Sequence, residues 1–324
     1  MLYPLTFQPI FKERVWGGRS LEKLYQKPLP PGVPIGESWE ITDRPEGVSV
    51  IANGPLAGKD LRWLMQQHRE ELLGAKPAAT ARFPLLIKIL DAQEKLSVQV
   101  HPPASVAAQL GGEPKTEMWY ITHATPEAEL FVGLKNGVTR PEFEKKIQDG
   151  TVADCIQRLP VKEGDAMFLP SGRVHAIGAG NVIFEIQQNS DTTYRVFDWN
   201  RTGLDGKPRE LHIPQSLASI DFNDFQPRLI TSLMSRNPVL AVRYLVEDPL
   251  FRVDACRVKR GQRFHLRCEG NLQILGLLRG RLNVTHGDQQ LNLSAGHFVL
   301  LPAALERVTL QTETQVEFLQ VQAG

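Results

Sequence analysis

The sequence predicts a mainly β protein built from two β-barrels, with a few helices inserted in its N-terminal half. Three observations support this fold class: many short strand patterns, few helical patterns, and one strand-turn-strand unit that occurs twice. With 324 residues, the chain is long enough for about two domains and for a sizeable core.

Short strand patterns separated by turns account for most of the chain. In them, apolar residues alternate with polar ones or form short runs, and clusters containing glycine or proline follow. The predicted strands cover 81–91, 95–101, 117–122, 129–132, 166–169, 182–187, 251–258, 271–278, 281–285, 290–293, 298–301 and 306–321. So many short strands favour a barrel or a sandwich.

Helical patterns are confined to the first two-thirds of the chain. Apolar residues recur at helical spacing in 60–74, where His68 lies on the apolar stripe and is interpreted as a core or boundary residue. Thr139 and the glutamate three positions later form a capping-box pattern that begins a helix over 139–150. The residues 151–159 are expected to continue as a second short helix.

The repeated unit suggests how the two barrels differ. GDAMFLPSGRVHA at 164–176 and GHFVLLPAALERVT at 296–309 share a glycine, five mostly apolar residues and a proline. The fifth residue after the proline is His175 in the first copy and Arg307 in the second. The second barrel is therefore expected to lack the group that the first presents.

Composition excludes several classes of function. Thirty-seven basic and 36 acidic residues leave a net charge of +1, so no overall field attracts nucleic acid or an anionic membrane. Residues 1–18 lack the features of a signal peptide, and no apolar stretch reaches membrane-spanning length. Cys155, Cys256 and Cys268 are odd in number and lack CxxC spacing, which argues against disulfides. We expect a soluble, cytoplasmic protein with buried or inert thiols.

The stretch LSVQVHPP, residues 96–103, places three polar side chains on one face of a strand. Ser97, Gln99 and His101 point the same way because side chains alternate with a period of two. A solvated face would explain this pattern by itself. His175 adds a second observation, since the preceding PSG turn places it at the start of the next strand.

The residues 164–175 resemble the second motif of the cupin superfamily, Gly-x5-Pro-x-Gly-x2-His. In metal-binding cupins this histidine meets ligands from an earlier hairpin, which here would supply Gln99, His101 and Glu117. Two imidazoles, a carboxylate and an amide oxygen suit a borderline divalent metal, with room for water or substrate.

The surrounding residues resemble a narrower group, the type I mannose-6-phosphate isomerases (phosphomannose isomerases) in their short bacterial form. The resemblance covers residues 1–222, and its motifs occur in the family's order. They are VWGG, GESWEI, FPLLIKILDAQEKLSVQVHPP, KTEMWYI, PSGRVHAIGAG, EIQQNSDTTYRVFDWNR and RELH. The chain departs from the longer members at Pro114, where they have a histidine, and in lacking most of their helical domain. Preference for mannose over a similar hexose is therefore less well defined than the isomerase class.

The same resemblance implies two domains of the cupin (jelly-roll) type. The boundary falls within 221–240, which mixes polar residues with two prolines and has no clear period. We expect a catalytic cupin domain at 1–235, carrying the short helical insertions. A degenerate second barrel without a metal site would occupy 236–324.

The resemblance assigns the polar residues of the first domain to two binding roles. The ligands of one zinc ion per chain would be Gln99, His101, Glu117 and His175. The contacts to the phosphate of a hexose 6-phosphate substrate would be Ser97, Lys88 and Arg201. Lys88 is informative by itself, because a lysine within an apolar strand is costly unless it is paired or faces an anion.

The implied reaction interconverts mannose 6-phosphate and fructose 6-phosphate by an enediol-type proton transfer. It requires a base, polarisation of the carbonyl and shelter from water. Arg195 is expected to stabilise the developing enediolate charge, with Glu185 or Lys115 as the base. Asp191 would steer Arg195 or take part in proton shuttling. The sequence does not rank these groups, and Glu185 and Asp191 could instead form only an ion-pair network around Arg195.

Two other classes of function fit parts of the sequence. A non-catalytic metal-binding cupin could sense or bind a sugar phosphate, but it would not need Arg195 or Glu185. An iron-dependent cupin oxygenase would be expected to bring more histidines to its metal. The remaining histidines are expected in surface or capping roles, and they are His123, His212, His265, His286 and His297.

Overall fold

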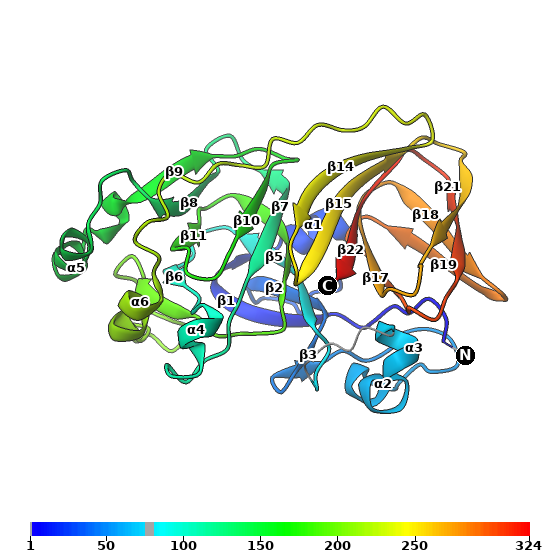
Figure 1. Ribbon diagram of the computed structural model, residues 1–324, viewed down its shortest axis with the longest axis horizontal. Coiled ribbons are helices and arrows are strands. Elements are labelled where there is room, and N and C mark those ends of the chain that lie inside the picture. Colours follow the sequence, from blue (N-terminus) through cyan, green and yellow to red (C-terminus); the bar gives the residue numbers. More distant parts are fainter. Residues whose placement is uncertain (1, 75–80) are drawn as a thin grey trace.

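The computed structural model describes residues 2–74 and 81–324. It confirms the mainly β class, because the strands form four large sheets arranged as two sets, shown side by side in Figure 1. All helices of the described residues lie before Ile220, in the N-terminal part of the chain, as expected. The number of barrels and the domain boundary stay predictions.

The first set of sheets contains every predicted metal ligand. Its strands are β1 (Ile10–Gly18), β2 (Ile35–Ile41), β5 (Leu85–Ala92), β6 (Val98–Val100), β7 (Glu117–Ala124), β8 (Glu129–Leu134), β9 (Ile156–Pro160), β10 (Ala166–Leu169), β11 (His175–Ile177), β12 (Asn181–Gln188) and β13 (Tyr194–Phe197). One sheet has the order β1-β2-β5-β12-β7-β10, and the other β13-β6-β11-β8-β9. A two-stranded hairpin, β3 (Asp43–Arg44) and β4 (Gly47–Val48), lies outside both.

The second set of sheets encloses an apolar interior. Its strands are β14 (Leu240–Glu247), β15 (Phe251–Val258), β16 (Arg263–Arg267), β17 (Gln273–Arg279), β18 (Arg281–His286), β19 (Gln289–Ser294), β20 (Phe298–Leu301), β21 (Arg307–Thr312) and β22 (Val316–Ala323). Their orders are β14-β15-β22-β17-β20 and β16-β21-β18-β19. Leu275, Val299 and Phe318 belong to the buried cluster between them, whereas Arg307 is exposed. The absence of a metal ligand in the second copy stays a prediction.

The two sets share one hydrophobic core. Leu5, near the start of the chain, exchanges two backbone hydrogen bonds of 2.8 Å with Leu300 on β20, so the N-terminal segment joins the second set. The rings of Phe184 on β12 and Phe298 on β20 lie 4.9 Å apart. Residues 226–239, without helix or strand, connect the sets along the top of Figure 1.

The helices are short, and they differ from two of the predictions. They are α1 (Ser20–Tyr25), α2 (Leu61–Gln67), α3 (Arg69–Leu73), α4 (Ala104–Ala107), α5 (Arg140–Gln148) and α6 (Ile213–Ser219). The helix expected over 60–74 is broken at His68, whose φ of −137° is not helical and whose Nδ1 pairs with Glu71. The second helix expected over 151–159 is wrong, since only a 3-10 turn precedes strand β9. None of the helices in the described part of the chain has the length and apolar character to cross a bilayer.

The strand predictions were accurate where alternation was regular and failed where it was not. The single strand expected over 306–321 is two strands, β21 and β22, separated by polar residues. The strands that were not predicted include β1, β2, β3, β4, β13, β14 and β16. In β2 all seven residues are buried although two are glutamates, so no apolar-polar alternation marks it.

Candidate functional site

Three buried side chains from separate strands form a candidate metal centre. His101 follows β6, Glu117 begins β7 and His175 begins β11, and their ligand atoms lie within 4.8 Å of one another. Nε2 of His101 is 3.5 Å from Glu117 Oε2, and Nε2 of His175 is 3.3 Å from Glu117 Oε1. The three side chains are almost completely buried. The polar face predicted for residues 96–103 therefore points inward.

Both imidazole rings are held in the orientation that a metal requires. Nδ1 of His101 lies 2.8 Å from the carbonyl oxygen of Thr192, and Nδ1 of His175 lies 2.9 Å from that of Arg173. A carbonyl oxygen only accepts, so each Nδ1 carries the hydrogen and donates it. Each Nε2 consequently keeps its lone pair facing Glu117, which is the usual arrangement of a metal-binding histidine.

Unsatisfied atoms support the same interpretation. Nε2 of His101 and both carboxylate oxygens of Glu117 are buried without a hydrogen-bond partner among the described residues. Nζ of Lys115 forms an ion pair with Glu117 at 2.8 Å, but its direction does not satisfy a hydrogen bond. Buried polar atoms of this kind are costly unless something binds them. The donor set fits a divalent cation.

The electrostatics keep the three groups in their metal-binding forms. Burial lowers the pKa of His175 to about 3, and burial together with the Lys115 charge lowers the pKa of His101. Burial by itself would raise the pKa of Glu117, but Lys115 and the two rings outweigh it and hold that pKa well below its usual range. Neutral imidazoles and a carboxylate anion are the states that bind metal ions.

Gln99, the fourth predicted ligand, lies next to the cluster. On β6 it is the cross-strand partner of His175 on one side and of Arg195 on the other. Its amide nitrogen is 3.3 Å from Nε2 of His175. Because the two ends of an amide are interchangeable by a half-turn, the same position can present Oε1 to a cation. Its role as a ligand stays a prediction.

A pocket of about 560 Å³ opens beside the candidate metal centre. Most of the residues predicted for catalysis and substrate binding line it, namely Lys88, Ser97, Lys115, Glu185, Asp191 and Arg195, and so does the predicted metal ligand Gln99. Trp16, Leu90 and Leu96 add apolar surface to the wall. The sequence therefore predicted groups that the fold brings together, although their roles stay predictions.

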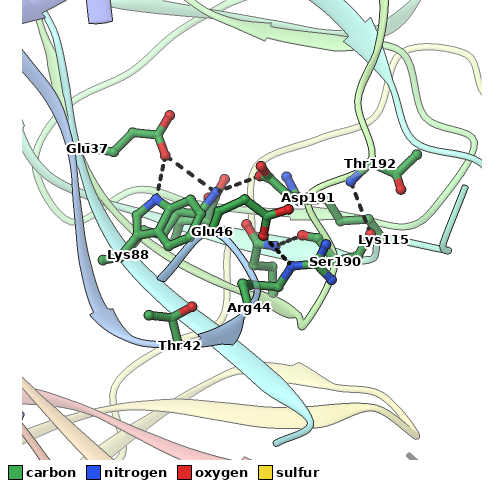
Figure 2. A network of polar contacts seen from close by, with 12 residues as sticks. Glu37, Thr42, Arg44, Glu46, Lys88, Lys115, Ser190, Asp191 and Thr192 are labelled. Carbon is green, nitrogen blue, oxygen red and sulfur yellow. Dashed lines mark hydrogen bonds and ion pairs between the residues drawn. The ribbon is translucent and has the colours of Figure 1, made fainter. Parts of the chain in front are cut away.

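Lys88 lies at the centre of a group of carboxylates. Its Nζ is 3.6 Å from Glu37, 3.5 Å from Glu185 and 3.6 Å from Asp191. Figure 2 shows Lys88 beside Glu37, with Asp191 in the same network. These partners explain how a lysine is accommodated within an apolar strand. The buried ion pairs centre on Lys88, and no contact between Asp191 and Arg195 occurs among the described residues.

Glu185 is buried and firmly oriented. It lies on β12 opposite Lys88 of β5 and Trp119 of β7. Its Oε1 accepts a hydrogen bond of 2.9 Å from the Trp119 indole nitrogen. Burial, followed by the negative charge of Glu117, raises the pKa of Glu185. The carboxylate is therefore held at the pocket wall in an environment that favours proton uptake.

Arg195 is anchored by groups that the sequence did not reveal. Its Nη1 donates to the carbonyl oxygen of Glu210 at 2.8 Å, and its backbone nitrogen donates to Nδ1 of His212 at 3.1 Å. His212 also lies at the N-terminus of α6, so its expected capping position is correct, but its ring supports Arg195. Nε of Arg195 is buried with no partner in the described part of the chain.

Arg201 does not line the pocket. Its guanidinium lies 2.9 Å from Asp198 and donates to the carbonyl oxygen of Lys95. Arg209, which was not predicted, shares the same carboxylate, with its Nε 2.7 Å from Asp198 Oδ2, and it does line the pocket. Arg201 also pairs with the Glu94 carboxylate at 3.8 Å, so the two guanidinium groups face two carboxylates.

Glu37 is a second pocket residue that the sequence analysis did not assign. It accepts from Arg14 Nε and from Trp39 Nε1, both at 2.7 Å. Burial by itself would raise its pKa, but Lys88 and Arg14 outweigh this and lower the pKa to about 2. The stretch GESWEI gave an indication of this role, because it places two glutamates in one short strand. The structure shows that every residue of that strand is buried.

Replacing Glu37 with glutamine is expected to remove a pH-dependent part of the stability. A carboxyl whose pKa falls from 4.5 to about 2 on folding stabilises the folded state by about 3 kcal/mol above pH 4.5. This contribution is lost as the pH falls from 4.5 toward 2. Urea unfolding of both proteins over this range should show the wild-type advantage shrinking as the pH falls. A difference that stays constant with pH would contradict the assignment.

The fold and the site together define a class, the mainly β proteins with a buried histidine-carboxylate cluster that could hold a metal beside a polar pocket. Residues 5–112 match the family described as phosphomannose isomerase type I, catalytic domain. The mannose-6-phosphate isomerase of Streptococcus mutans is 36% identical, with 94% of each chain covered. A probable mannose-6-phosphate isomerase of Bacillus subtilis, GmuF, is 34% identical over 96% of this chain and 97% of its own.

Solved structures agree with these relatives. The crystal structure of mannose 6-phosphate isomerase from Bacillus subtilis is 30% identical and covers the whole of both chains, with a TM-score of 0.90. A phosphomannose isomerase from Salmonella typhimurium, 16% identical with a TM-score of 0.78, shares the fold. The chain belongs to the type I phosphomannose isomerase family, and it is an isomerase. The family predicted from the sequence motifs is thereby confirmed.

Proposed function

We propose that the protein interconverts mannose 6-phosphate and fructose 6-phosphate in a zinc-dependent aldose-ketose isomerisation. The observation that carries the proposal is the buried set His101, Glu117 and His175, whose unpartnered atoms adjoin a pocket lined by Glu185 and Arg195. Relatives that carry the name mannose-6-phosphate isomerase match nearly the whole chain at 33% to 36% identity.

Zinc is the metal that best suits the proposed donors. Two imidazole nitrogens, one carboxylate oxygen and the Gln99 amide oxygen make a mixed nitrogen and oxygen set, which a borderline cation prefers. When bound, the cation would polarise or orient the sugar oxygens. His101, Glu117, His175 and Gln99 would hold one ion per chain.

Glu185 is the group that we propose as the base. Its carboxylate lies in the pocket wall, held by Trp119 and Lys88, and within residues 2–74 and 81–324 it has no hydrogen bond or ion pair with a proposed metal ligand. Lys115, the alternative, is held in an ion pair with Glu117, one of the proposed metal ligands, at 2.8 Å. Glu185 would take the proton from C2 of the aldose and return it to C1, while the hydroxyl proton of O2 passes to O1, so that the carbonyl moves from C1 to C2. Asp191 would assist Glu185 indirectly, through the ion pair that Asp191 forms with Lys88.

Arg195 would neutralise the negative charge that develops on the sugar oxygens. Its guanidinium is fixed at one corner by the Glu210 carbonyl, while its buried Nε has no protein partner among the described residues. A preorganised donor of this kind stabilises charge in the transition state more than in the substrate.

The phosphate would bind at Ser97, Lys88 and Arg201, with Arg209 added by the structure. Ser97 and Lys88 line the pocket, but Lys88 already faces three carboxylates, so it offers little free positive charge. Arg201 and Arg209 share the carboxylate of Asp198, and Arg201 also pairs with Glu94, so a phosphate would compete with these carboxylates for the two guanidinium groups. Arg209 has the better access, because it lines the pocket.

A coupled assay tests the proposed reaction. The zinc-loaded protein should convert mannose 6-phosphate to fructose 6-phosphate without consuming oxygen, and a chelator should abolish the conversion until zinc is restored. Binding of the sugar phosphate without turnover would instead support a non-catalytic sensor. Oxygen consumption would support an oxygenase. Glucose 6-phosphate and unphosphorylated mannose serve as controls for substrate preference.

The cellular setting follows from the thiols and the charge. Cys155, Cys256 and Cys268 are free and buried, and burial raises the pKa of Cys256 to about 12, so these thiols are inert. Unpaired cysteines suit a reducing compartment. We propose a cytoplasmic enzyme, a monomer or weak homo-oligomer, whose partner is a hexose 6-phosphate.

A further inference from the structure

The orientation of His101 depends on a single backbone carbonyl. Its Nδ1 donates to Thr192, in the loop 189–193 that joins β12 to β13. If that carbonyl moved away, the ring could carry its hydrogen on Nε2 instead, and the atom facing Glu117 would no longer be a lone pair. Contacts that hold this loop in place therefore also hold the ring orientation of His101, the proposed metal ligand.

The loop is joined to a second segment of the site, residues 112–116. The backbone nitrogen of Glu113 donates to Oγ1 of Thr192 at 2.9 Å, and Oγ of Ser190 donates to the carbonyl oxygen of Glu113 at 3.2 Å. The two segments carry Asp191 on one side and Lys115 on the other, both in the pocket wall. They can move only together.

Arg44, on the hairpin strand β3, connects both segments from outside the pocket. Its Nη1 donates to the Glu113 carboxylate at 2.6 Å and to the carbonyl oxygen of Asn189 at 3.1 Å. Figure 2 shows Arg44 beside Glu46 and Ser190 in the same network. Arg44 is 8% exposed, and Arg82 adds a second ion pair to Glu113.

We propose that Arg44 is a positioning residue for the metal centre. By holding Glu113 and Asn189 together, it keeps the Thr192 carbonyl in place, and so keeps Nε2 of His101 available to a metal. Arg44 itself does not line the pocket and so does not act as a catalytic residue. The proposal rests on the metal site of the proposed function. It assigns a role to the β3–β4 hairpin, which carries no other site residue.

Two substitutions at Arg44 separate positioning from simple packing. Arg44→Met keeps the length of the side chain and removes both hydrogen bonds, whereas Arg44→Lys keeps the charge and one donor. Supporting contacts of metal-binding histidines are worth about 10- to 100-fold in metal affinity. The zinc Kd of Arg44→Met, measured by chelator competition on folded full-length protein, should rise by about 10-fold. The zinc Kd of Arg44→Lys should lie between those of Arg44→Met and wild type.

Arg62→Met provides a matched control. Arg62 on α2 pairs with Asp43, the neighbour of Arg44 on the same hairpin, but touches neither Glu113 nor Asn189. Arg62→Met should lower the unfolding temperature and leave the zinc Kd unchanged. If Arg44→Met has the zinc Kd of wild type, the inference is wrong. If Arg44→Met does not fold, Glu113→Gln, at a partly exposed carboxylate, carries the same test.

A spectroscopic measurement makes the test independent of metal binding. In the zinc-free protein, nitrogen NMR of the His101 ring should show hydrogen on Nδ1, and Arg44→Met should shift the population toward Nε2. An unchanged tautomer in Arg44→Met would overturn the inference. Failure of the wild-type protein to bind zinc would overturn the proposed metal site instead, so the two failures are distinguishable.

Discussion

Glu117→Gln is expected to lose its bound zinc and to lower kcat by more than the factor of about 100 found for supporting contacts of metal ligands. Glu117 is fully buried between two imidazoles, and both of its oxygens lack a hydrogen-bond partner among the described residues. Glutamine keeps the shape but supplies only a neutral amide, so the site loses its only anionic donor. Metal analysis after dialysis, together with the coupled assay, measures both effects.

The control for this variant is a glutamate in an exposed ion pair. Glu163 pairs with Arg279 on the surface, and Glu163→Gln should keep the zinc content and the activity of wild type. Full zinc occupancy with full activity in Glu117→Gln would contradict the proposed centre. Loss of zinc with retained activity would leave the metal site in place and remove its catalytic role.

Arg195→Ala is expected to lower kcat by about 100- to 1000-fold, the usual cost of removing one preorganised donor to a developing oxyanion. Zinc content should stay at the wild-type value, because Arg195 is not a proposed ligand, although it lies beside Gln99 in the sheet. KM should change less than kcat, because the interaction is strongest in the transition state. Steady-state kinetics and metal analysis of the same sample provide the comparison.

Two further variants test whether the loss of kcat in Arg195→Ala is specific to the Arg195 guanidinium. Arg195→Lys keeps the charge without the planar fork and should recover only part of the activity. Arg158→Ala removes an exposed arginine paired with Glu129 and should have no effect on kcat. An Arg195→Ala enzyme with unchanged kcat would show that the segment 194–197 does not contact the reacting atoms.

Local patterns predicted where the proposed ligands His175 and Gln99 lie, whereas the family resemblance alone implied their role as metal ligands. The proline and glycine before His175 direct it into β11, and the two-residue period of β6 gives Gln99 and Ser97 a common face. Glu37, Arg209 and His212 were not assigned to the site. Their partners are Lys88, Asp198 and Arg195, which lie between 11 and 51 positions away along the chain. No local pattern announces such pairs.

The wrong helix over 151–159 has a related cause. Its apolar residues fit a helical period and a strand equally well over so short a segment. Pairing with β8, more than 20 positions earlier, selects the strand β9 instead. Tertiary contacts overrode local preference there. At His68, by contrast, the ring at the helix break makes a local contact with Glu71, three residues later.

The pairing of Leu5 with Leu300 has a consequence for the order of folding. During synthesis Leu5 emerges long before Leu300 exists, so these two backbone hydrogen bonds close only when nearly the whole chain has been made. The core that joins Ile87 and Phe184 to Phe298 is completed at the same late stage. The second set of sheets contributes no residue to the lining of the candidate active-site pocket. The first set, which lines the pocket, nevertheless reaches its final packing only together with the second set.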